Sequence, residues 1–329
     1  MNILLTGAFG NIGSSALPEL LAQGHRVRCF VRKSRAHEAK AQLLTHNPQV
    51  ELAWGDLRRP EDLAAAMTGQ EIVIHLAYIL PPRAYDTPEE AYATNVEGTR
   101  NLLQAALQQP QPPKFLFGST YAVFGSTTQH VRHADDPTQA SEMYTRQKLT
   151  CEKLVKDSGL LWAIYRFADA PPLTVQKPHP MVFTIGLDTR MEFVHTTDAG
   201  LALANGISRD IWGRTWLIGG GPTCQTDYRT YLSRMLVAAG LDMLPESAFE
   251  AWPWGTDWLD SSESEALLHY QRHSFDEIVR DVAAVTAPRG AAKAIMPLIK
   301  PLVRATMLRM AKNRRREKQQ RPEPEIASI

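Results

Sequence analysis

Short apolar segments alternate with amphipathic ones along the first half of the chain. The apolar segments are rich in Leu and β-branched residues, which is typical of strands buried on both faces of a sheet. They lie at residues 2–6, 26–31, 50–54, 71–76, 114–119 and 161–166. Apolar positions at helical spacing lie between them, at residues 11–22, 36–44, 60–67, 88–107 and 141–157. The alternation predicts an α/β fold with a Rossmann-type, doubly wound parallel sheet.

The pattern loosens after Arg166. Residues 170–180 contain four prolines and should be irregular. Helical spacing returns at residues 197–207, 227–239, 262–268 and 275–285, and a strand at 216–218 ends in three glycines. We therefore expect residues 167–288 to form a smaller region across the carboxyl ends of the strands, part of which returns to the sheet.

Charge is distributed unevenly along the chain. The formal net charge is +1, but residues 289–321 carry 11 of the 36 Lys and Arg residues and a single acid, Glu317. Residues 1–288 hold 25 basic and 32 acidic residues, a net charge of −7. A near-neutral chain with an acidic body is not typical of a nucleic-acid-binding protein.

Cysteine usage and hydropathy bear on the cellular compartment. Cys29, Cys151 and Cys224 lie far apart with no CxxC or Cys/His spacing, so neither a disulfide framework nor a metal site is expected. No run of 18 uncharged apolar residues is present, so no segment should span a bilayer. The strand predicted at residues 2–6 leaves no space for a leader peptide before it. Together these features predict a cytoplasmic protein.

Residues 289–329 predict a basic amphipathic helix followed by a disordered tail. One helical face within residues 291–312 carries Ile295, Leu298, Ile299, Leu302, Thr306 and Met310, and Lys and Arg occupy much of the rest. Such a helix can make peripheral contact with an anionic membrane, dock on the acidic body or join two copies into a homodimer. The sequence leaves these three alternatives open. Residues 314–329 have the composition of a disordered segment.

A glycine-rich turn joins the first strand to the first helix. It reads Thr6-Gly7-Ala8-Phe9-Gly10-Asn11-Ile12-Gly13. Glycines permit a tight turn and let the backbone approach a pyrophosphate at the helix N-terminus. Within a strand–turn–helix unit, the motif predicts that residues 1–166 form a dinucleotide-binding Rossmann domain. The residues expected to bind the cofactor in this turn are Gly7, Phe9, Gly10, Asn11, Ile12 and Gly13.

The end of the second strand indicates which dinucleotide binds. An acid at this point would bind the ribose hydroxyls of NAD, but Arg32 and Lys33 are present instead. A guanidinium suits a 2′-phosphate and can also stack on adenine. NADP is therefore the favoured cofactor and NAD the alternative, unless Arg32 is only a solvated residue after a strand.

Further motifs follow in order. They are Gly55-Asp56-Leu57, His75-Leu76-Ala77, Asn95-Val96-Glu97-Gly98-Thr99, Ser119-Thr120, Tyr144 with Lys148, Phe193-Val194-His195 with Asp198, and Ile218-Gly219-Gly220-Gly221. Together they resemble the extended short-chain dehydrogenase/reductases, of the NAD(P)-dependent epimerase/dehydratase type. The resemblance implies that Asp56, Leu57, Leu76, Ala77, Tyr78 and Asn95 lie at the cofactor site. Asp56 as a helix cap and Asn95 as a polar residue inside a helix are the structural alternatives.

Tyr144 and Lys148 are four residues apart on a predicted helix, so both can point into one cleft. A phenol with a pKa of about 10 is a poor base at neutral pH. A nearby ammonium and an oxidised nicotinamide would favour the phenolate and lower that pKa. The resemblance implies that Lys148 also holds the nicotinamide ribose and that Thr120, with Ser119 as the alternative, hydrogen-bonds the substrate oxygen. Thr120, Tyr144 and Lys148 are thus the expected catalytic residues.

Two departures from the family pattern bear on the substrate. Gln147 precedes Lys148 where Ser or Thr is usual, and only 26 residues separate Arg166 from Phe193, where sugar-nucleotide enzymes carry a longer insertion. The leading hypothesis is an NAD(P)-dependent oxidoreductase that transfers hydride between nicotinamide and a small or lipophilic carbonyl or alcohol. The alternatives are an epimerase or dehydratase acting on a sugar-like substrate and a non-catalytic dinucleotide sensor.

Aromatic residues after the predicted strands are candidates for substrate contact. Tyr85, Tyr121 and Trp254 are expected to face the substrate, together with residues 78–80 and 168–173. Packing within a lid is the alternative for the cluster of Trp252, Trp254 and Trp258. The resemblance assigns His195 to the support of the fold rather than to the chemistry.

Overall fold

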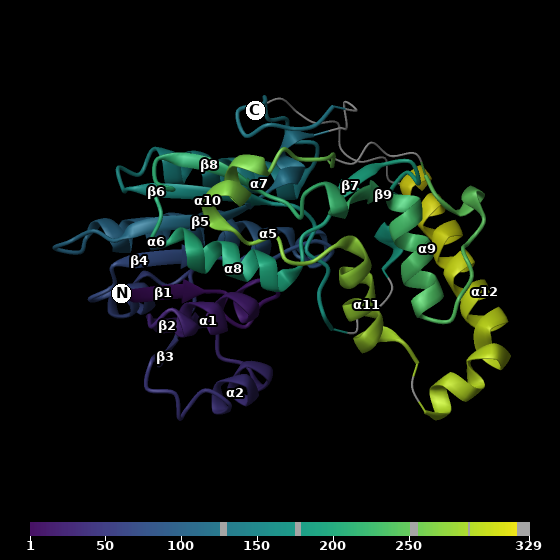
Figure 1. Ribbon diagram of the computed structural model, residues 1–329, viewed down its shortest axis with the longest axis horizontal. Coiled ribbons are helices and arrows are strands. Elements are labelled where there is room, and N and C mark those ends of the chain that lie inside the picture. The colour runs from purple at the N-terminus through teal and green to yellow at the C-terminus, as the bar shows by residue number, and fades with distance from the viewer. Residues whose placement is uncertain (126–129, 175–178, 251–255, 289, 321–329) are drawn as a thin grey trace.

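Seven parallel strands form the central sheet (Figure 1). The computed structural model describes residues 1–125, 130–174, 179–250, 256–288 and 290–320. The spatial order is β3 (Val50–Trp54), β2 (Arg26–Val31), β1 (Asn2–Thr6), β4 (Ile72–His75), β5 (Lys114–Thr120), β6 (Trp162–Phe167) and β8 (Arg214–Ile218). All six neighbouring pairs are parallel. The predicted Rossmann-type sheet is confirmed, and β8 is the part of the second region that returns to it.

Helices cover both faces of this sheet. One face packs against α1 (Gly13–Ala22), α2 (Arg35–Gln42), α8 (Thr196–Gly206) and α10 (Ser262–Leu268). The other packs against α3 (Pro60–Met67), α6 (Gly98–Leu107) and α7 (Met143–Lys156). The strands are buried because both faces are covered, which explains their continuous apolar character. The chain crosses from one face to the other between β1 and β4, so the carboxyl ends of these strands form the crevice in which such folds bind ligands.

The helix predicted at residues 88–107 is divided in the structure. After the short helix α4 (Arg83–Asp86), α5 (Pro88–Tyr92) leads into a π-helical turn, η1 (Ala93–Glu97), and then into α6. Such turns widen the helix by one residue and often occur at functional sites. Here the turn contains Asn95, whose side chain is fully buried.

The C-terminal region has its own apolar core beside the sheet (Figure 1). It includes the antiparallel pair β7 (Arg190–Glu192) and β9 (Gln225–Asp227) and the helices α9 (Tyr228–Ala238), α11 (Phe275–Thr286) and α12 (Ala291–Gln320). Short 3₁₀ turns complete it: η3 (Pro180–Phe183), η4 (Pro222–Cys224) and η5 (Glu246–Ala248). A further one, η2 (Tyr121–Phe124), follows β5.

Helix α12 extends past residue 314, where the predicted disordered segment begins, as far as Gln320. Met307 and Ala311 are buried in the C-terminal core, whereas Leu298 is 81 % and Leu302 69 % exposed. The helix therefore packs on the body through one face and presents apolar side chains on another. In the described part of the chain, no helix is long and apolar enough to cross a membrane.

Candidate active site

A cavity of about 580 Å³ opens at the carboxyl ends of the strands. It is lined by most of the residues predicted for the cofactor and for catalysis, although these are distant in the sequence. The predicted residues along its wall are Gly7, Phe9, Gly10, Asn11, Ile12, Gly13, Arg32, Asp56, Leu57, Leu76, Ala77, Tyr78, Thr120, Tyr144 and Lys148. The cleft lies where folds of this type bind a dinucleotide and a small substrate.

The turn after β1 leaves no space for side chains at two of its glycines. A Cβ atom on Gly7 would lie 2.7 Å from the Ala77 nitrogen, and Gly7 has a φ of +73°. A Cβ atom on Gly13 would lie 2.2 Å from the Gly7 carbonyl oxygen. The backbone is thereby exposed at the N-terminus of α1, where N–H groups and the helix dipole favour a phosphate. The residues present therefore fit a dinucleotide.

A buried chain of hydrogen bonds holds β1 beside β4 at the cavity. The Thr6 hydroxyl accepts from the Leu76 and Ala77 amides, both at 3.2 Å, and lies 2.7 Å from Nδ1 of His75. The other ring nitrogen of His75 lies 2.9 Å from the Thr99 hydroxyl. Burial, with the nearby charge of Lys148, lowers the pKa of His75 to about 3. His75 is therefore a neutral structural residue that positions the loop of residues 76–77.

Charged residues surround the outer end of the cavity beyond β2. The Arg32 guanidinium donates to Glu90 at 3.1 Å, and Arg83 donates to the same carboxylate at 2.9 Å. Arg32 and Arg83 both line the cavity. Asp56 also lines it, and its ion pair with Arg58 lowers the pKa of the carboxyl. Two guanidiniums thus converge on one carboxylate at the place where the end of β2 would meet a ribose.

Thr120 and Tyr144 both line the inner end of the cavity, and their hydroxyl groups interact with each other. A hydrogen bond with the Thr120 hydroxyl acts to lower the pKa of the Tyr144 phenol, but burial and the negative charge of Glu142 outweigh it. The net direction is a raised pKa, opposite to the expectation from the sequence. Burial is the main cause. Glu142 adds to it, because it caps the N-terminus of α7, accepts from the Tyr144 amide at 2.8 Å and so places a carboxylate beside the phenol.

Lys148 lies one turn further along α7 and is only 4 % exposed. Its ammonium donates to the Gly118 carbonyl at 2.6 Å and lies 3.6 Å from the centre of the Tyr78 ring. Burial lowers the pKa of Lys148 to about 7. Tyr144 and Lys148 therefore line the same cavity, as the spacing of four residues predicts.

Ser119 is engaged elsewhere. Its hydroxyl donates to Glu152 at 2.6 Å, and Glu152 forms a buried ion pair with Arg166 at 2.8 Å. This leaves Thr120 as the hydroxyl that pairs with Tyr144, in preference to Ser119.

Comparison with known proteins agrees with this geometry. Residues 3–167 match the model of the NAD dependent epimerase/dehydratase family. The chain belongs to this family.

Relatives of the family differ in what they act on. A 3-beta-hydroxysteroid dehydrogenase of Mycolicibacterium neoaurum is 32 % identical over 163 residues, which cover 46 % of this chain and 42 % of that protein. A D-erythronate dehydrogenase of Haemophilus influenzae is 27 % identical over 303 residues, covering 86 % of this chain and 89 % of that protein. The match to the first of these thus spans less than half of the relative.

Solved structures of the family show the same fold. The UDP-glucuronic acid 4-epimerase of Bacillus cereus, in complex with UDP-glucuronic acid and NAD, superposes with a TM-score of 0.72 at 21 % identity. The superposition covers 87 % of this chain and 99 % of that structure. NAD(P) dependence is a property of the family.

Three of the predicted site residues that the structure describes do not line the cavity. Asn95 is fully buried and bonds both the amide and the carbonyl of Ile79, at 2.7 and 3.0 Å. We correct its expected role from cofactor contact to positioning of the loop after β4. Tyr121 is 1 % exposed and donates to Asp169 at 2.9 Å, and Tyr85 donates to Glu142. Trp254 and Trp252 lie outside the described residues.

Trp258 lies away from the cavity wall, whereas parts of both expected substrate loops line the cavity. The Trp258 indole donates to the Thr226 carbonyl at 3.0 Å, and the Arg190 guanidinium lies 3.8 Å from its ring centre. It therefore packs against the β7–β9 pair, which favours the structural alternative for this residue. Tyr78, Ile79 and Leu80 do line the cavity, as do Ala168, Asp169 and Ala170.

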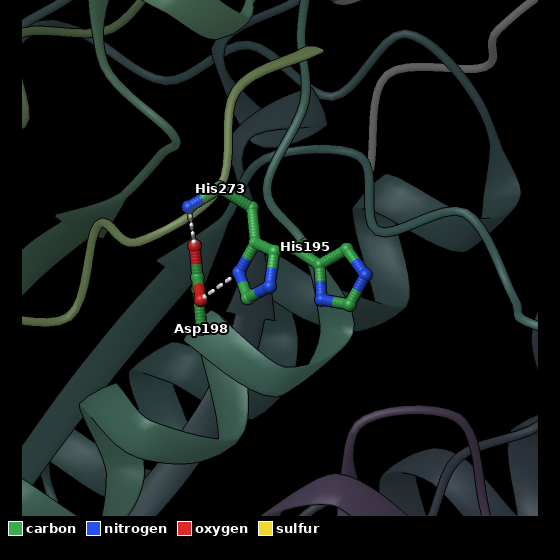
Figure 2. Close-up of side chains that lie close together, drawn as sticks. All are labelled: His195, Asp198 and His273. Carbon is green, nitrogen blue, oxygen red and sulfur yellow. Dashed lines mark hydrogen bonds and ion pairs between the residues drawn. The ribbon is translucent and has the colours of Figure 1, made fainter. Parts of the chain in front are cut away.

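His195, Asp198 and His273 form a cluster beside the sheet (Figure 2). Asp198 accepts from the amides of Arg272 and His273, both at 3.0 Å, and from Nδ1 of His273 at 2.7 Å. Nδ1 of His195 accepts from the Thr197 amide at 3.2 Å as the N-cap of α8. These contacts fasten the segment before α11 to α8. This agrees with the structural role expected for His195.

Sequence reasoning did not single out several residues on the cavity wall. Asp169 was included only as part of residues 168–173, and His37 and Arg83 were not considered. The His37 imidazole lies 2.7 Å from the Arg32 carbonyl oxygen. Position within two residues of the end of a strand is the signal that could have selected Asp169, since the carboxyl ends of parallel strands converge on the ligand.

Proposed function

We propose that this chain is an NADP(H)-preferring oxidoreductase that transfers hydride between nicotinamide and a small or lipophilic carbonyl or alcohol. The observation that carries the proposal is the convergence of Thr120, Tyr144 and Lys148 on the cavity that also contains the glycine turn. A proton-transfer pair has no use in a protein that only senses a dinucleotide. The arrangement therefore supports an enzyme over a sensor.

The residues of the cavity have distinct roles in this proposal. Gly7, Gly10 and Gly13 cradle the pyrophosphate, and the bound nicotinamide supplies the hydride-transfer chemistry. In the direction of reduction, the Tyr144 phenol donates a proton to the carbonyl oxygen while Thr120 hydrogen-bonds that oxygen. A phenol with a raised pKa stays protonated at neutral pH, so the Tyr144 phenol of the structure is in the form that donates a proton.

Lys148 has two tasks in the proposed mechanism. It holds the nicotinamide ribose, and as an ammonium it lowers the pKa of Tyr144 for the reverse direction. Its own pKa of about 7 means that the charge is sensitive to what occupies the cavity. Ligand hydroxyls that accept from Lys148 would favour the charged form.

Cofactor preference rests on Arg32. Its guanidinium lines the cavity and has a neighbour, Arg83, at the same carboxylate. A 2′-phosphate offers more acceptors and more charge than Glu90 and would compete for both guanidiniums. These contacts support NADP, with NAD as the alternative.

The substrate is proposed to be smaller than a nucleotide sugar. The 26 residues between Arg166 and Phe193 leave little chain for a nucleotide pocket. An epimerase or dehydratase acting on a sugar-like substrate is the second candidate, because the superposed Bacillus cereus structure is an epimerase. Such enzymes regenerate the cofactor within one turnover, so tight retention through purification would favour this candidate.

The test of the proposed function is NADPH oxidation by the purified chain with a panel of aldehydes and ketones, read at 340 nm. Turnover that depends on Tyr144 supports the reductase. Dinucleotide binding without turnover of any carbonyl or sugar nucleotide would support the sensor instead.

We also propose that the exposed face of α12 makes peripheral contact with anionic membranes. Ile295, Leu298 and Leu302 are exposed on this face, and the exposed cations Arg309 and Lys312 follow on the same helix. No acid occurs between residues 282 and 316, so the charge complements an anionic surface. The alternative is that a second copy of the chain packs on the same face and forms a homodimer.

A further inference from the structure

Asp169 is a carboxyl group on the wall of the cavity that the proposed mechanism does not use. It is the second residue after β6 and lines the same cavity as Thr120, Tyr144 and Lys148. Its charge contributes to the raised pKa of Tyr144, so it lies on the side of the cavity where the carbonyl would react.

The backbone holds this carboxyl group firmly in place. The Asp169 amide donates to the Glu192 carbonyl at 3.1 Å, and the Asp169 carbonyl accepts from the Val194 amide at 2.9 Å. The next residue, Ala170, accepts from the Asn11 side chain of the glycine turn at 2.7 Å. Asp169 is thus fixed between the cofactor turn and the β7 segment.

Within the described part of the chain, one oxygen of the Asp169 carboxyl group accepts a hydrogen bond and the other has none. The Tyr121 phenol donates to Oδ2 of Asp169 at 2.9 Å. Among the described residues, no Lys, Arg or His forms an ion pair with Asp169 at 4.0 Å or less. Burial raises the pKa of Asp169 to about 6, with Tyr121 acting in the opposite direction. At pH 7.5 the group is therefore mainly a carboxylate with capacity for one more donor.

We propose that Asp169 selects the substrate: it accepts a hydrogen bond from an uncharged hydroxyl or amino group and excludes anionic groups from the inner cavity. A carboxylate in a partly buried site repels phosphate strongly, because few water molecules screen the two charges. Hydroxyl and amino donors satisfy the free acceptor. The inference rests on the proposed function and narrows its substrate class to carbonyls and alcohols that carry no phosphate.

The proposal separates this chain from its structural neighbour. UDP-glucuronic acid, bound in the Bacillus cereus epimerase, carries a diphosphate and a carboxylate. In this chain such a ligand would bring its negative charges into the cavity that holds Asp169. The carboxyl group thus gives an electrostatic reason for excluding nucleotide sugars, independent of the short segment between β6 and residue 193.

The test uses UDP as an anionic probe on the full chain saturated with NADPH, which occupies the dinucleotide site. Calorimetry at pH 7.5 should show UDP binding at least about tenfold tighter to Asp169→Asn than to the unmodified protein. Asp169→Ser, a second neutral variant, should show the same gain. Asp188→Asn removes an exposed surface carboxylate and should match the unmodified protein.

A second measurement compares D-glyceraldehyde with D-glyceraldehyde 3-phosphate. The ratio of kcat/KM for the two aldehydes should shift toward the phosphorylated one, at least about tenfold, in Asp169→Asn. Equal UDP affinity in the unmodified protein and both neutral variants would overturn the inference. Lack of NADPH oxidation with every carbonyl would instead refute the proposed reductase. The UDP titration would still test whether Asp169 excludes anions, because it measures binding and not turnover.

Discussion

The Lys148 ammonium lies 3.6 Å from the centre of the Tyr78 ring. Tyr78 also contacts the Tyr144 ring edge to face, with 5.9 Å between the ring centroids. A cation over an aromatic face is stabilised by the ring quadrupole. Tyr78 therefore supports both members of the proposed proton-transfer pair from the end of β4, and it compensates in part for the burial of a lysine.

Replacing Tyr144 by Phe tests the proposed proton donor. The variant keeps the ring against Tyr78 but loses the hydroxyl, so turnover should fall by about 10²–10⁴-fold. NADPH affinity, measured by fluorescence titration, should remain nearly unchanged. Tyr92→Phe is the matched control, because Tyr92 is 49 % exposed. A Tyr144→Phe enzyme with most of its turnover would refute the assignment.

The low pKa of Lys148 predicts a pH-dependent contribution to stability. The folded cofactor-free protein releases this proton near pH 7, whereas the unfolded chain holds it to about pH 10. Because the unfolded state binds more protons in this window, the free energy of unfolding from Lys148 rises with pH, by at most about 1.4 kcal/mol per pH unit. Urea unfolding at pH 7, 8 and 9 should show this slope and its loss in Lys148→Met.

Lys153→Met provides the control on the same helix. The Lys153 side chain is 79 % exposed and pairs with Asp157 at the surface. The slope should survive in this variant. Identical slopes in the unmodified protein and Lys148→Met would show that the Lys148 proton does not differ between the two states.

Arg32 and Glu90 should have opposite effects on NADPH affinity, because Arg32 attracts a 2′-phosphate and Glu90 competes with it for Arg32. Arg32→Ala removes a charge-assisted pair and should weaken NADPH binding by about 10- to 150-fold while leaving NADH binding nearly unchanged. Glu90→Gln releases Arg32 and Arg83 and should tighten NADPH binding. Lys33→Ala, which removes a 76 % exposed cation, is the control. Equal affinities of the unmodified protein for NADH and NADPH would contradict the preference.

The exposed face of α12 can be tested without disturbing its buried face. The double variant Leu298→Glu with Leu302→Glu should lose co-sedimentation with vesicles of phosphatidylserine and phosphatidylcholine, since it removes apolar contact and adds negative charge. Leu43 is 85 % exposed and is distant in the sequence from α12, so the Leu43→Glu variant should bind vesicles like the unmodified protein. Vesicle binding by neither protein, with a reduced hydrodynamic mass in the double variant, would identify the face as a dimer contact.

The sequence predicted the sheet and the glycine turn on the cavity wall well, because both depend on local signals. A strand buried on two faces is apolar throughout, and the turn after β1 needs glycine where a Cβ atom would clash with Ala77 or Gly7. The directions of Tyr85 and Tyr121 could not be predicted in this way. They depend on the acids Glu142 and Asp169, which are 57 and 48 residues away.

The pKa of Tyr144 shows a similar limit. Spacing on a helix correctly brought Tyr144 and Lys148 to one cavity, but it did not reveal that Glu142 would cap the same helix beside the phenol. A net effect on a pKa sums burial and every nearby charge. Only the three-dimensional arrangement gives that sum.

The hydrogen bond from the Asn11 side chain to the Ala170 carbonyl has a kinetic consequence. Asn11 belongs to the turn that receives the pyrophosphate, and Ala170 follows the carboxyl group proposed to select the substrate. A dinucleotide bound in the turn would therefore further stabilise the substrate wall in this position before a substrate arrives. We expect compulsory-order kinetics in which the dinucleotide enters first and leaves last. In product-inhibition experiments, NADP and NADPH should then be the only pair of substrate and product that inhibit competitively. Asn11→Ala should loosen this order toward random entry.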